Sequence, residues 1–326
     1  MERLDAFMAR ANAAYYAAHD PFRDFTTSPE ISQVFGEILG LWAAVVWEHI
    51  GRPDPILLVE AGPGRGTLMA DALRAIGQVA PAFGSALRVH LIETSARLRA
   101  AQAERLPGAI WHEGLETLPL EPFVLLANEF LDALPIRQFV KRGDGWTERF
   151  VHRGQFVEVP VECFHGLADR EGGAGGVAEL NEPALAIARA VGTRLTNQPG
   201  AALFLDYGPE HSAAGDSLQA LRDGRPANPL DAPGAGDLTA HVDFEAFANA
   251  ARDAGAVTHG PIPQGIFLAR LGLFQRTDRL ARMRPAGQAA GLIEAARRLA
   301  EPDRMGRLFK AIAFGGPGRP LPPGFE

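Results

Sequence analysis

The chain has 326 residues, a formal net charge of −7 and a pI near 5.8. This acidic balance argues against a nucleic-acid partner, because surfaces that bind nucleic acids normally carry an excess of basic side chains. A single cysteine, Cys163, excludes an internal disulfide and a cysteine-based metal site, and we predict no metal site of another kind. The length permits one large domain or two small ones.

Composition also bears on the compartment. No basic segment followed by an apolar one begins the chain, so we predict no signal peptide. The longest apolar stretch nearby, residues 38–46, is too short to span a bilayer, and we expect no membrane insertion. Of the 32 basic residues only Lys141 and Lys310 are lysines, a bias typical of GC-rich bacterial genomes. We therefore expect a bacterial, cytoplasmic protein.

The first part of the chain carries helical patterns. Residues 4–18 predict a helix that ends before residues 20–22. Ser28 then predicts a second helix start as an N-cap, with Pro29 at the first helical position. A segment ahead of the first strand can fold over a cofactor, although simple capping also explains Ser28. We assign residues 1–52 to an N-terminal helical extension that covers the cofactor.

Residues 56–73 predict a buried parallel strand, a tight turn and a helix. Four apolar residues lead to Glu60, and glycines follow at the alternate positions Gly62, Gly64 and Gly66. Glycine suits such a turn because it accepts positive φ and lets a ligand lie directly on the main chain. This is the first unit of a doubly wound α/β sheet, which we place in residues 53–326.

The spacing of this turn indicates its ligand. A dinucleotide site shows G-x-G-x-x-G, whereas here a carboxylate precedes glycines at alternate positions. Glu60 would repel a pyrophosphate but suits a ligand with an ammonium group. The turn therefore favours S-adenosylmethionine over NAD, and a turn without any ligand is the alternative.

The second strand, residues 88–93, ends at Glu93, which lies 27 residues after Gly66. An acid at this position accepts the ribose hydroxyls in nucleotide-binding α/β folds. Capping of the next helix is the alternative for Glu93. In the turn after the third strand we expect Gly114 and Leu115 beside the adenine.

A central strand over residues 122–128 ends in polar side chains. Asn128, Glu129 and Asp132 follow it, and ligands of open α/β sheets bind beyond the carboxyl ends of the strands. These side chains are therefore expected where a methyl acceptor would sit. Helix capping by Asn128 or Asp132 is the alternative.

From residue 136 the pattern changes. Short alternating runs separated by glycines predict an antiparallel β-rich insertion over residues 136–182, with an exposed loop at 166–176. Residues 201–208 form another buried strand that carries Asp206 near its end. His241 stands among aspartates and suggests an acid–base role, although a lone histidine at a helix start is more often a cap or a packed side chain. Two amphipathic helices are expected after it, over residues 264–281 and 286–300.

Five long, non-repetitive motifs together resemble a known family. They are DFTTSPEISQVFGE (24–37), EAGPGRGTL (60–68), NEFLDALP (128–135), LDYG (205–208) and DLTAHVDF (237–244). With them the chain resembles the class I S-adenosylmethionine-dependent methyltransferases that include the mitochondrial complex I assembly-factor methyltransferase. The resemblance runs over nearly the whole chain.

The resemblance implies an α/β fold: a Rossmann-like, doubly wound sheet of seven strands with an N-terminal helical extension and an inserted β/helical subdomain. It also implies methyl transfer to an arginine side chain of a protein, with a quinone-module subunit of complex I as the mitochondrial enzyme's target. The chain departs from the family at Ala14, where the family has glycine before two tyrosines, and in residues 20–25, which lack the family's glycine. This departure bears on substrate capture rather than on cofactor binding.

The candidate residues form two sets. The cofactor set is Ser28, Pro29, Glu60, Gly62, Gly64, Gly66, Glu93, Gly114, Leu115 and Asn128. The catalytic set, expected on the acceptor side, is Glu129 and Asp132, with Asp206 and His241 behind them. Carboxylates are chosen because a guanidinium acceptor is oriented by bidentate contacts to them.

Two other functions stay open. The first is an assembly chaperone that binds S-adenosylmethionine but works mainly by docking a partner, with little or no catalysis. The second is an NAD-dependent oxidoreductase, against which the glycine spacing and Glu60 both argue. The sequence does not indicate the oligomeric state.

Overall fold

The computed structural model describes residues 1–19, 26–162 and 175–326. Cys163, most of the loop expected at 166–176 and the helix break expected at 20–22 lie outside this part of the chain. The chain divides into two compact units, which do not follow the division expected at residue 52. The sheet unit comprises residues 27–130, 188–207 and 248–326, and the accessory unit comprises residues 1–26, 131–187 and 208–247.

The sheet unit contains a seven-stranded sheet with the order β14-β15-β10-β5-β2-β3-β4. Its strands are β2 (Ile56–Ala61), β3 (Leu87–Ile92), β4 (Ile110–His112), β5 (Phe123–Asn128), β10 (Gly200–Tyr207), β14 (Val257–Pro263) and β15 (Phe309–Gly315). β15 runs antiparallel to β10 and β14, whereas β10, β5, β2, β3 and β4 pair in parallel. Every residue of β2 and β5 is buried, which explains their continuous apolar sequences. The seven-stranded α/β prediction is confirmed.

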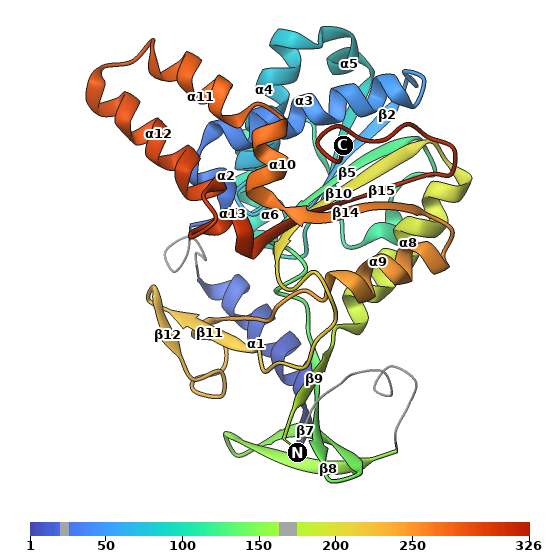
Figure 1. The fold of residues 1–326 in the computed structure, drawn as a ribbon, viewed down its shortest axis with the longest axis vertical. Helices are drawn as coiled ribbons and strands as arrows, with labels where there is room; N and C mark the ends of the chain where they lie inside the picture. The colour runs from blue at the N-terminus through green and yellow to red at the C-terminus, as the bar shows by residue number, and fades with distance from the viewer. Residues whose placement is uncertain (20–25, 163–174) are drawn as a thin grey trace. The chain divides into compact units, whose positions relative to one another are not determined.

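Helices cover both faces of this sheet, with α3 and α4 on one side and α8 and α9 on the other (Figure 1). The helices of the sheet unit are α2 (Ser28–Ile31), α3 (Gln33–His49), α4 (Thr67–Val79), α5 (Pro81–Ala86), α6 (Ala96–Arg105), α10 (Gln264–Arg270), α11 (Leu273–Ala281), α12 (Ala286–Ala300) and α13 (Met305–Leu308), with a 3-10 turn η2 (Leu115–Thr117). The helices α8 (Glu182–Asn197) and α9 (Phe244–Asp253) belong in part to each unit.

Two glycines bring α3 and α4 into close contact. A Cβ on Gly36 would lie 2.8 Å from Leu68 O, and one on Gly40 would lie 2.7 Å from Ala72 Cα. The apolar face of α3, including the fully buried Trp42, joins the main hydrophobic core. The apolar face of this helix therefore packs inside the sheet unit.

Two expected helices are each divided in the structure. The helix predicted from Ser28 breaks at Ser32, whose extended backbone separates α2 from α3 and whose Oγ accepts from Val34 N at 3.3 Å. The helix predicted over 264–281 breaks at Gly272, which has a φ of +89°. In both cases the apolar periodicity continues across the break, so periodicity alone does not locate it.

In its described residues the accessory unit contains two smaller sheets and the helix α1 (Leu4–Ala18), besides the first residues of α8 and α9. The first sheet has the order β1-β7-β6-β9, with β8 paired to β7, and the second has the order β12-β11-β13. Their strands are β1 (Glu2–Arg3), β6 (Arg137–Arg142), β7 (Gly145–His152), β8 (Gln155–Val161), β9 (Val177–Leu180), β11 (Gln219–Arg222), β12 (Arg225–Ala227) and β13 (Asp237–Thr239). The helix over residues 4–18 and the antiparallel insertion were both expected, whereas the second sheet was not.

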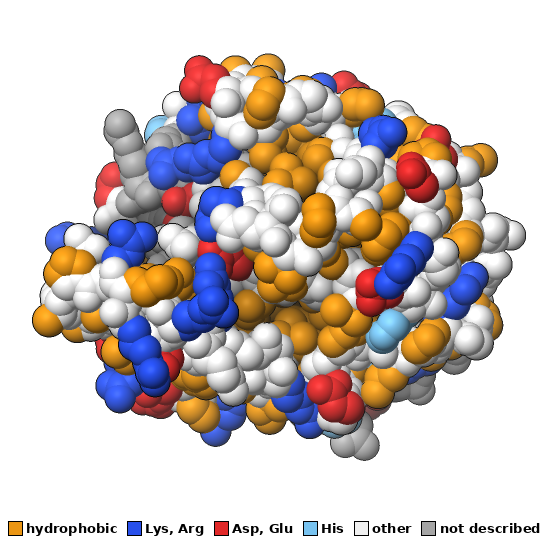
Figure 2. Space-filling model, turned by 90° about the horizontal axis from the view of Figure 1, so that it is seen from above, with side chains coloured by type: hydrophobic (Ala, Val, Ile, Leu, Met, Phe, Trp, Pro, Cys, Tyr) orange, Lys and Arg blue, Asp and Glu red, His pale blue; other side chains and the backbone are white. Residues whose placement is uncertain are grey.

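Apolar surface is spread over the molecule. Figure 2 shows a face on which hydrophobic side chains gather among scattered charged ones. Exposed apolar side chains of the C-terminal helices include Ile266, Phe274, Ile293 and Leu308.

None of the helices within residues 1–19, 26–162 and 175–326 combines the length and the apolar character needed to cross a bilayer.

Candidate functional site

The turn after β2 contains three glycines in the left-handed backbone region. Gly62, Gly64 and Gly66 have φ of +65°, +54° and +74°, values that other residues rarely adopt. The N–H of Gly62 donates to Ile92 O at the end of β3 at 3.1 Å. A Cβ on Gly62 would lie 2.7 Å from Phe130 Cδ2. Backbone conformation and space therefore both require glycine at position 62.

Glu60, near the end of β2, is only 3% exposed. Burial raises the pKa of Glu60 to about 8, against the opposing effect of the Met69 N–H that donates to its carboxylate. Oε2 of Glu60 and Oδ1 of Asn128, on the adjacent strand β5, have no hydrogen-bond partner within the described residues. Buried acceptors without donors are costly. Each of these oxygens can therefore accept a hydrogen bond from a bound ligand.

Glu93 follows β3 directly and is partly buried. Its Oε1 accepts from Ser95 N at 2.8 Å, and its Oε2 accepts from Gln102 Nε2 at 3.2 Å. Burial raises the pKa of Glu93 above its usual range, while these donors oppose the shift. Ser95 itself caps α6 through a bond from Leu98 N. Helix capping is thus performed by Ser95, which leaves the proposed ribose role of Glu93 open.

Gln102 is a residue that the sequence did not single out. It lies on α6 and is completely buried. Its Nε2 donates to Gly64 O at 2.7 Å as well as to Glu93, and its Oε1 accepts from Trp111 Nε1 at 2.8 Å. A single amide therefore connects the glycine turn to the expected ribose carboxylate. No local pattern marks it, because Gly64 is 38 positions away in the sequence.

The segment with Gly114 and Leu115 follows β4 and is anchored by two histidines. His90 Nδ1 and His112 Nε2 lie 2.8 Å apart, and His112 Nδ1 lies 3.0 Å from Thr117 Oγ1. Burial lowers the pKa of His90 to about 4 and also lowers the pKa of His112. Both rings are therefore neutral near pH 7. Gly114 is extended, and Leu115 begins η2.

Ser28 does not cap a helix as predicted. The N-cap of α2 is Thr27, so that Ser28 and Pro29 are already its first two residues. Instead, the backbone N–H and the Oγ of Ser28 both donate to Glu129 Oε1, at 2.8 and 2.9 Å. Thr67, at the start of α4, donates to Glu30 from the same segment. The segment that contains Ser28 and Pro29 is thus fastened at the end of β5 and beside the glycine turn.

Glu129 and Asp206, two of the catalytic candidates, bind groups of the sheet unit itself. Glu129 has a φ of +49°, and its Oε1 accepts from Asn128 Nδ2 at 3.0 Å in addition to Ser28. Burial raises the pKa of Glu129 above its usual range. Asp206 is 1% exposed and accepts from the backbone N–H groups of Phe130, at 3.1 Å, and Tyr207, at 2.9 Å. Both carboxylates therefore shape the ends of β5 and β10.

Asp132 and His241 lie in the accessory unit. Asp132 is buried, and its carbonyl oxygen accepts from Ala240 N at 2.9 Å. His241 is exposed, and its backbone N–H donates to Ser217 Oγ at 2.8 Å. Asp132 is thus shielded from solvent, whereas His241 is not.

A second feature that the sequence missed is the pair Tyr16 and Asp237, also in the accessory unit. The hydroxyl of Tyr16, on α1, donates to Asp237 Oδ1 at 2.9 Å. Burial and the negative charges of Asp237 and Asp132 raise the pKa of Tyr16 well above its usual range. Two carboxylates from distant parts of the chain therefore act on one phenol. Both aspartates belong to motifs visible in the sequence, but only the fold brings them to Tyr16.

Comparison with known families and proteins agrees with this architecture. The sequence model of the family described as "Putative S-adenosyl-L-methionine-dependent methyltransferase" matches residues 38–262. Two similar curated proteins are named mitochondrial protein arginine methyltransferase NDUFAF7. That of Danio rerio is 32% identical over 91% of this chain and 78% of its own length, and that of Homo sapiens is 32% identical over 96% and 79%.

Solved structures extend the similarity to the fold. A structure from Burkholderia thailandensis bound to S-adenosyl-homocysteine has a TM-score of 0.79 and 26% identity, covering 99% of this chain and 88% of that one. A second structure from the same organism has a TM-score of 0.80 and 29% identity with the same coverage. The similarity therefore includes both units of the chain.

Proposed function

Because the chain belongs to the family of S-adenosylmethionine-dependent methyltransferases, we propose that it transfers the methyl group to an arginine side chain of a protein. The arginine acceptor is supported by the curated relatives, which are named protein arginine methyltransferases and match at least 91% of this chain in the two cases above. The observation that carries the proposal within the molecule is the pair of unpartnered buried oxygens of Glu60 and Asn128 beside the left-handed glycine turn.

The sheet unit supplies the cofactor contacts in this proposal. When bound, S-adenosylmethionine supplies an activated methyl group on a sulfonium. Glu60 and Asn128 accept from its ammonium group, and the bare backbone of Gly62, Gly64 and Gly66 gives it close access to the main chain. Glu93 accepts from the ribose hydroxyls, held in place by Gln102.

The adenine and the cover complete the cofactor contacts. Gly114 and Leu115 lie beside the adenine in this proposal, and Ser28 and Pro29 cover the cofactor from the segment fastened to Glu129. Methyl transfer is an in-line displacement, so the protein contributes mainly orientation and the exclusion of water. Glu129 and Asp206 serve here as positioning residues rather than as groups that touch the acceptor.

The accessory unit supplies the acceptor contacts. Asp132 and Asp237 are 7% and 4% exposed, and the effect of both charges on Tyr16 supports a shared polar environment. Carboxylates hold the planar fork of a guanidinium by bidentate bonds. They also draw positive charge toward the nitrogens that do not attack, so the attacking nitrogen keeps more of its lone pair.

The proposed target is supported by the family resemblance, and the proposed compartment by the composition. A quinone-module subunit of complex I, or its bacterial equivalent, is the proposed acceptor protein, because the family includes a complex I assembly-factor methyltransferase. The arginine-rich, lysine-poor composition supports a bacterial cytoplasmic enzyme.

The test measures methylated arginine directly. Purified protein is incubated with methyl-labelled S-adenosylmethionine and the isolated quinone-module subunits, which are then hydrolysed to amino acids. The proposal expects labelled methylarginine with the natural chain and none with Asp132→Asn, while cofactor binding by Asp132→Asn stays unchanged. Label on another residue type would contradict the arginine acceptor.

The alternative is an assembly chaperone that holds the cofactor without turning it over. The two hydrogen bonds from Ser28 to Glu129 favour this alternative, because they give the Glu129 carboxylate a structural role instead of a catalytic one. Under this alternative, Asp132→Asn leaves partner binding and assembly unchanged. Under the methyltransferase proposal, Asp132→Asn abolishes methylation.

A further inference from the structure

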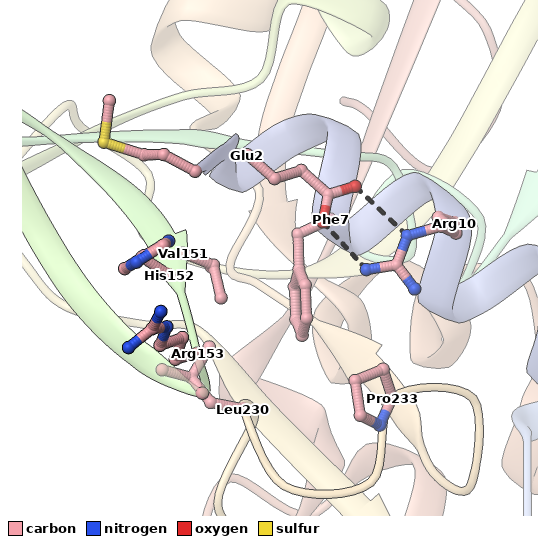
Figure 3. Close-up of a pocket in the computed structure, with 10 residues that line it drawn as sticks. Glu2, Phe7, Arg10, Val151, His152, Arg153, Leu230 and Pro233 are labelled. Atoms are coloured by element: carbon pink, nitrogen blue, oxygen red, sulfur yellow. Dashed lines mark hydrogen bonds and ion pairs between the residues drawn. The ribbon is translucent and has the colours of Figure 1, made fainter.

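A pocket with a volume of about 380 Å³ lies within the accessory unit (Figure 3). Phe7, Val151 and Leu230 line its inner side with the small part of their surface, 3%, 7% and 7%, that the hydrophobic core of this unit leaves exposed. Figure 3 shows the ring of Phe7 pointing from α1 into the space that these side chains surround. A pocket of this size suits a small organic molecule rather than a single ion.

One cation at the rim is already paired. Arg10 Nε and Nη2 donate to Glu2 Oε1 and Oε2 at 3.1 and 2.8 Å, as the dashed lines in Figure 3 show. The guanidinium carbon of Arg10 also lies 5.5 Å from the centre of the Phe7 ring. The charges of Arg10 and Glu2 therefore neutralise each other at the rim of the pocket, beside its apolar side chains.

Arg153 is the second cation at the rim, and it is not paired. Its side chain makes no hydrogen bond or ion pair with any residue in 1–19, 26–162 or 175–326. Among the side chains that line the pocket, two arginines and one glutamate leave one positive charge, in a chain whose net charge is −7. An anion would find its counterion here.

The backbone at Arg153 gives independent support for a function. His152 and Gln155 pair across the end of β7 and β8, so Arg153 and Gly154 form a two-residue turn. Both have positive φ, +52° and +72°, as in type I′ turns, which favour Asn-Gly or Asp-Gly. Arginine in this conformation costs about 1 kcal/mol or more.

Another two-residue hairpin of this unit, between β11 and β12, shows the usual choice for a turn with two positive φ values. Asp223 and Gly224 occupy its turn with φ of +52° and +69°. The same backbone geometry is therefore built from a favoured residue in one hairpin and from an unfavoured arginine in the other. A locally unfavourable residue with an unpaired charge at the rim of a pocket is a candidate for a binding role.

We propose that this pocket binds a small organic anion with an apolar body, of the arylalkyl carboxylate class. The apolar part lies against Phe7, Val151 and Leu230, and the carboxylate pairs with Arg153. The inference does not rest on methyl transfer, since none of the residues that line this pocket is assigned to the cofactor or to the acceptor.

The test is calorimetric titration of the full chain with 3-phenylpropionate, with the cofactor site saturated by S-adenosylhomocysteine. The natural chain is expected to bind the probe, and Arg153→Asn is expected to bind about tenfold more weakly, as for loss of a charged hydrogen bond. Asn suits a left-handed turn, so the Tm of Arg153→Asn should stay equal or rise. Weaker binding together with an undiminished Tm separates binding from folding.

Two controls complete the experiment. Arg225→Asn removes an exposed arginine of β12 in the same unit and should leave the affinity unchanged. Acetate lacks the apolar body and 3-phenylpropanamide lacks the charge, so each should bind at least about fivefold more weakly than 3-phenylpropionate. Absence of binding by the natural chain, equal affinity of Arg153→Asn, or equal binding of acetate would overturn the proposal.

Discussion

The side-chain amide of Gln102 donates to the backbone oxygen of Gly64 at 2.7 Å. The same nitrogen donates to Glu93 Oε2 at 3.2 Å, so one buried group fixes both the glycine turn and the carboxylate assigned to the ribose. Gln102→Met preserves the side-chain volume but removes both donors. We expect S-adenosylhomocysteine to bind about tenfold more weakly to this variant, as measured by calorimetry, because each lost bond to a buried group costs about 1 kcal/mol.

Trp111→Phe is the matched control for Gln102. It removes only the bond from Trp111 Nε1 to Gln102 Oε1 and leaves both donations of the amide in place. Its cofactor affinity should therefore change far less than that of Gln102→Met, even where the two variants lose similar stability. Equal losses of cofactor affinity in Gln102→Met and Trp111→Phe would show that the Gln102 side chain acts through packing and not through its two donated hydrogen bonds.

Glu60 makes both stability and cofactor binding depend on pH. Its pKa is about 8 in the folded chain and about 4.3 in an unfolded one. Between these values the folded state holds the proton that the unfolded state has released, so the free energy of unfolding falls as pH rises. The slope is at most about 1.4 kcal/mol per pH unit. In Glu60→Gln, the free energy of unfolding measured in urea should lose the part of its pH dependence that Glu60 causes.

Cofactor affinity should have the opposite pH trend. The ammonium group of S-adenosylmethionine favours the ionised form of Glu60, so its affinity should rise as pH rises toward and through about 8. Calorimetric titrations at several pH values on the natural chain and on Glu60→Gln measure this. A pH profile that is the same in both proteins would exclude Glu60 as the partner of the ammonium.

Ser28 connects the N-terminal segment to Glu129 by two bonds, of which only one depends on its hydroxyl. Ser28→Ala should lower the free energy of unfolding by about 1 kcal/mol and weaken cofactor binding, because the segment that covers the cofactor is less firmly held. Ser28→Thr keeps the hydroxyl and serves as the control. Retained affinity in Ser28→Ala, despite the lower stability, would argue against the covering role.

Gly62 is required both for its positive φ and for the space that Phe130 occupies beside it, and a control variant distinguishes these two effects. Gly62→Ala meets both a φ of +65° and the Phe130 ring at 2.7 Å. Gly51→Ala meets a φ of +97° but has no atom within 4 Å of its new Cβ. Gly51→Ala should therefore cost about 1 kcal/mol, and Gly62→Ala more, with loss of cofactor binding in the second alone. Similar thermal unfolding of the two variants would contradict a steric role of Phe130.

The central sheet could be predicted from the sequence because its evidence is local. β2 and β5 are buried on both faces and therefore read as continuous apolar runs, and the glycines at 62, 64 and 66 mark the turn after β2. The second sheet of the accessory unit was missed, because β11, β12 and β13 have only three or four residues each. Strands that short leave little alternation to detect.

Only those parts of the candidate site that lie within a single sequence motif could be predicted. Ser28 looks like a helix cap within its own segment, and its partner Glu129 lies 101 positions away. Gln102 and Tyr16 have the same difficulty, since each acquires its partners through the fold. Local motifs therefore identify the candidate carboxylates, and tertiary contacts decide which of them is available to a ligand.

The most direct test of the whole account is calorimetric titration of the purified chain with S-adenosylmethionine, and separately with NAD, repeated on Glu93→Ala. We predict micromolar affinity for S-adenosylmethionine, a loss of about tenfold or more in Glu93→Ala, and no binding of NAD. Equal affinity of Glu93→Ala for S-adenosylmethionine, or binding of NAD in its place, would contradict the site described above.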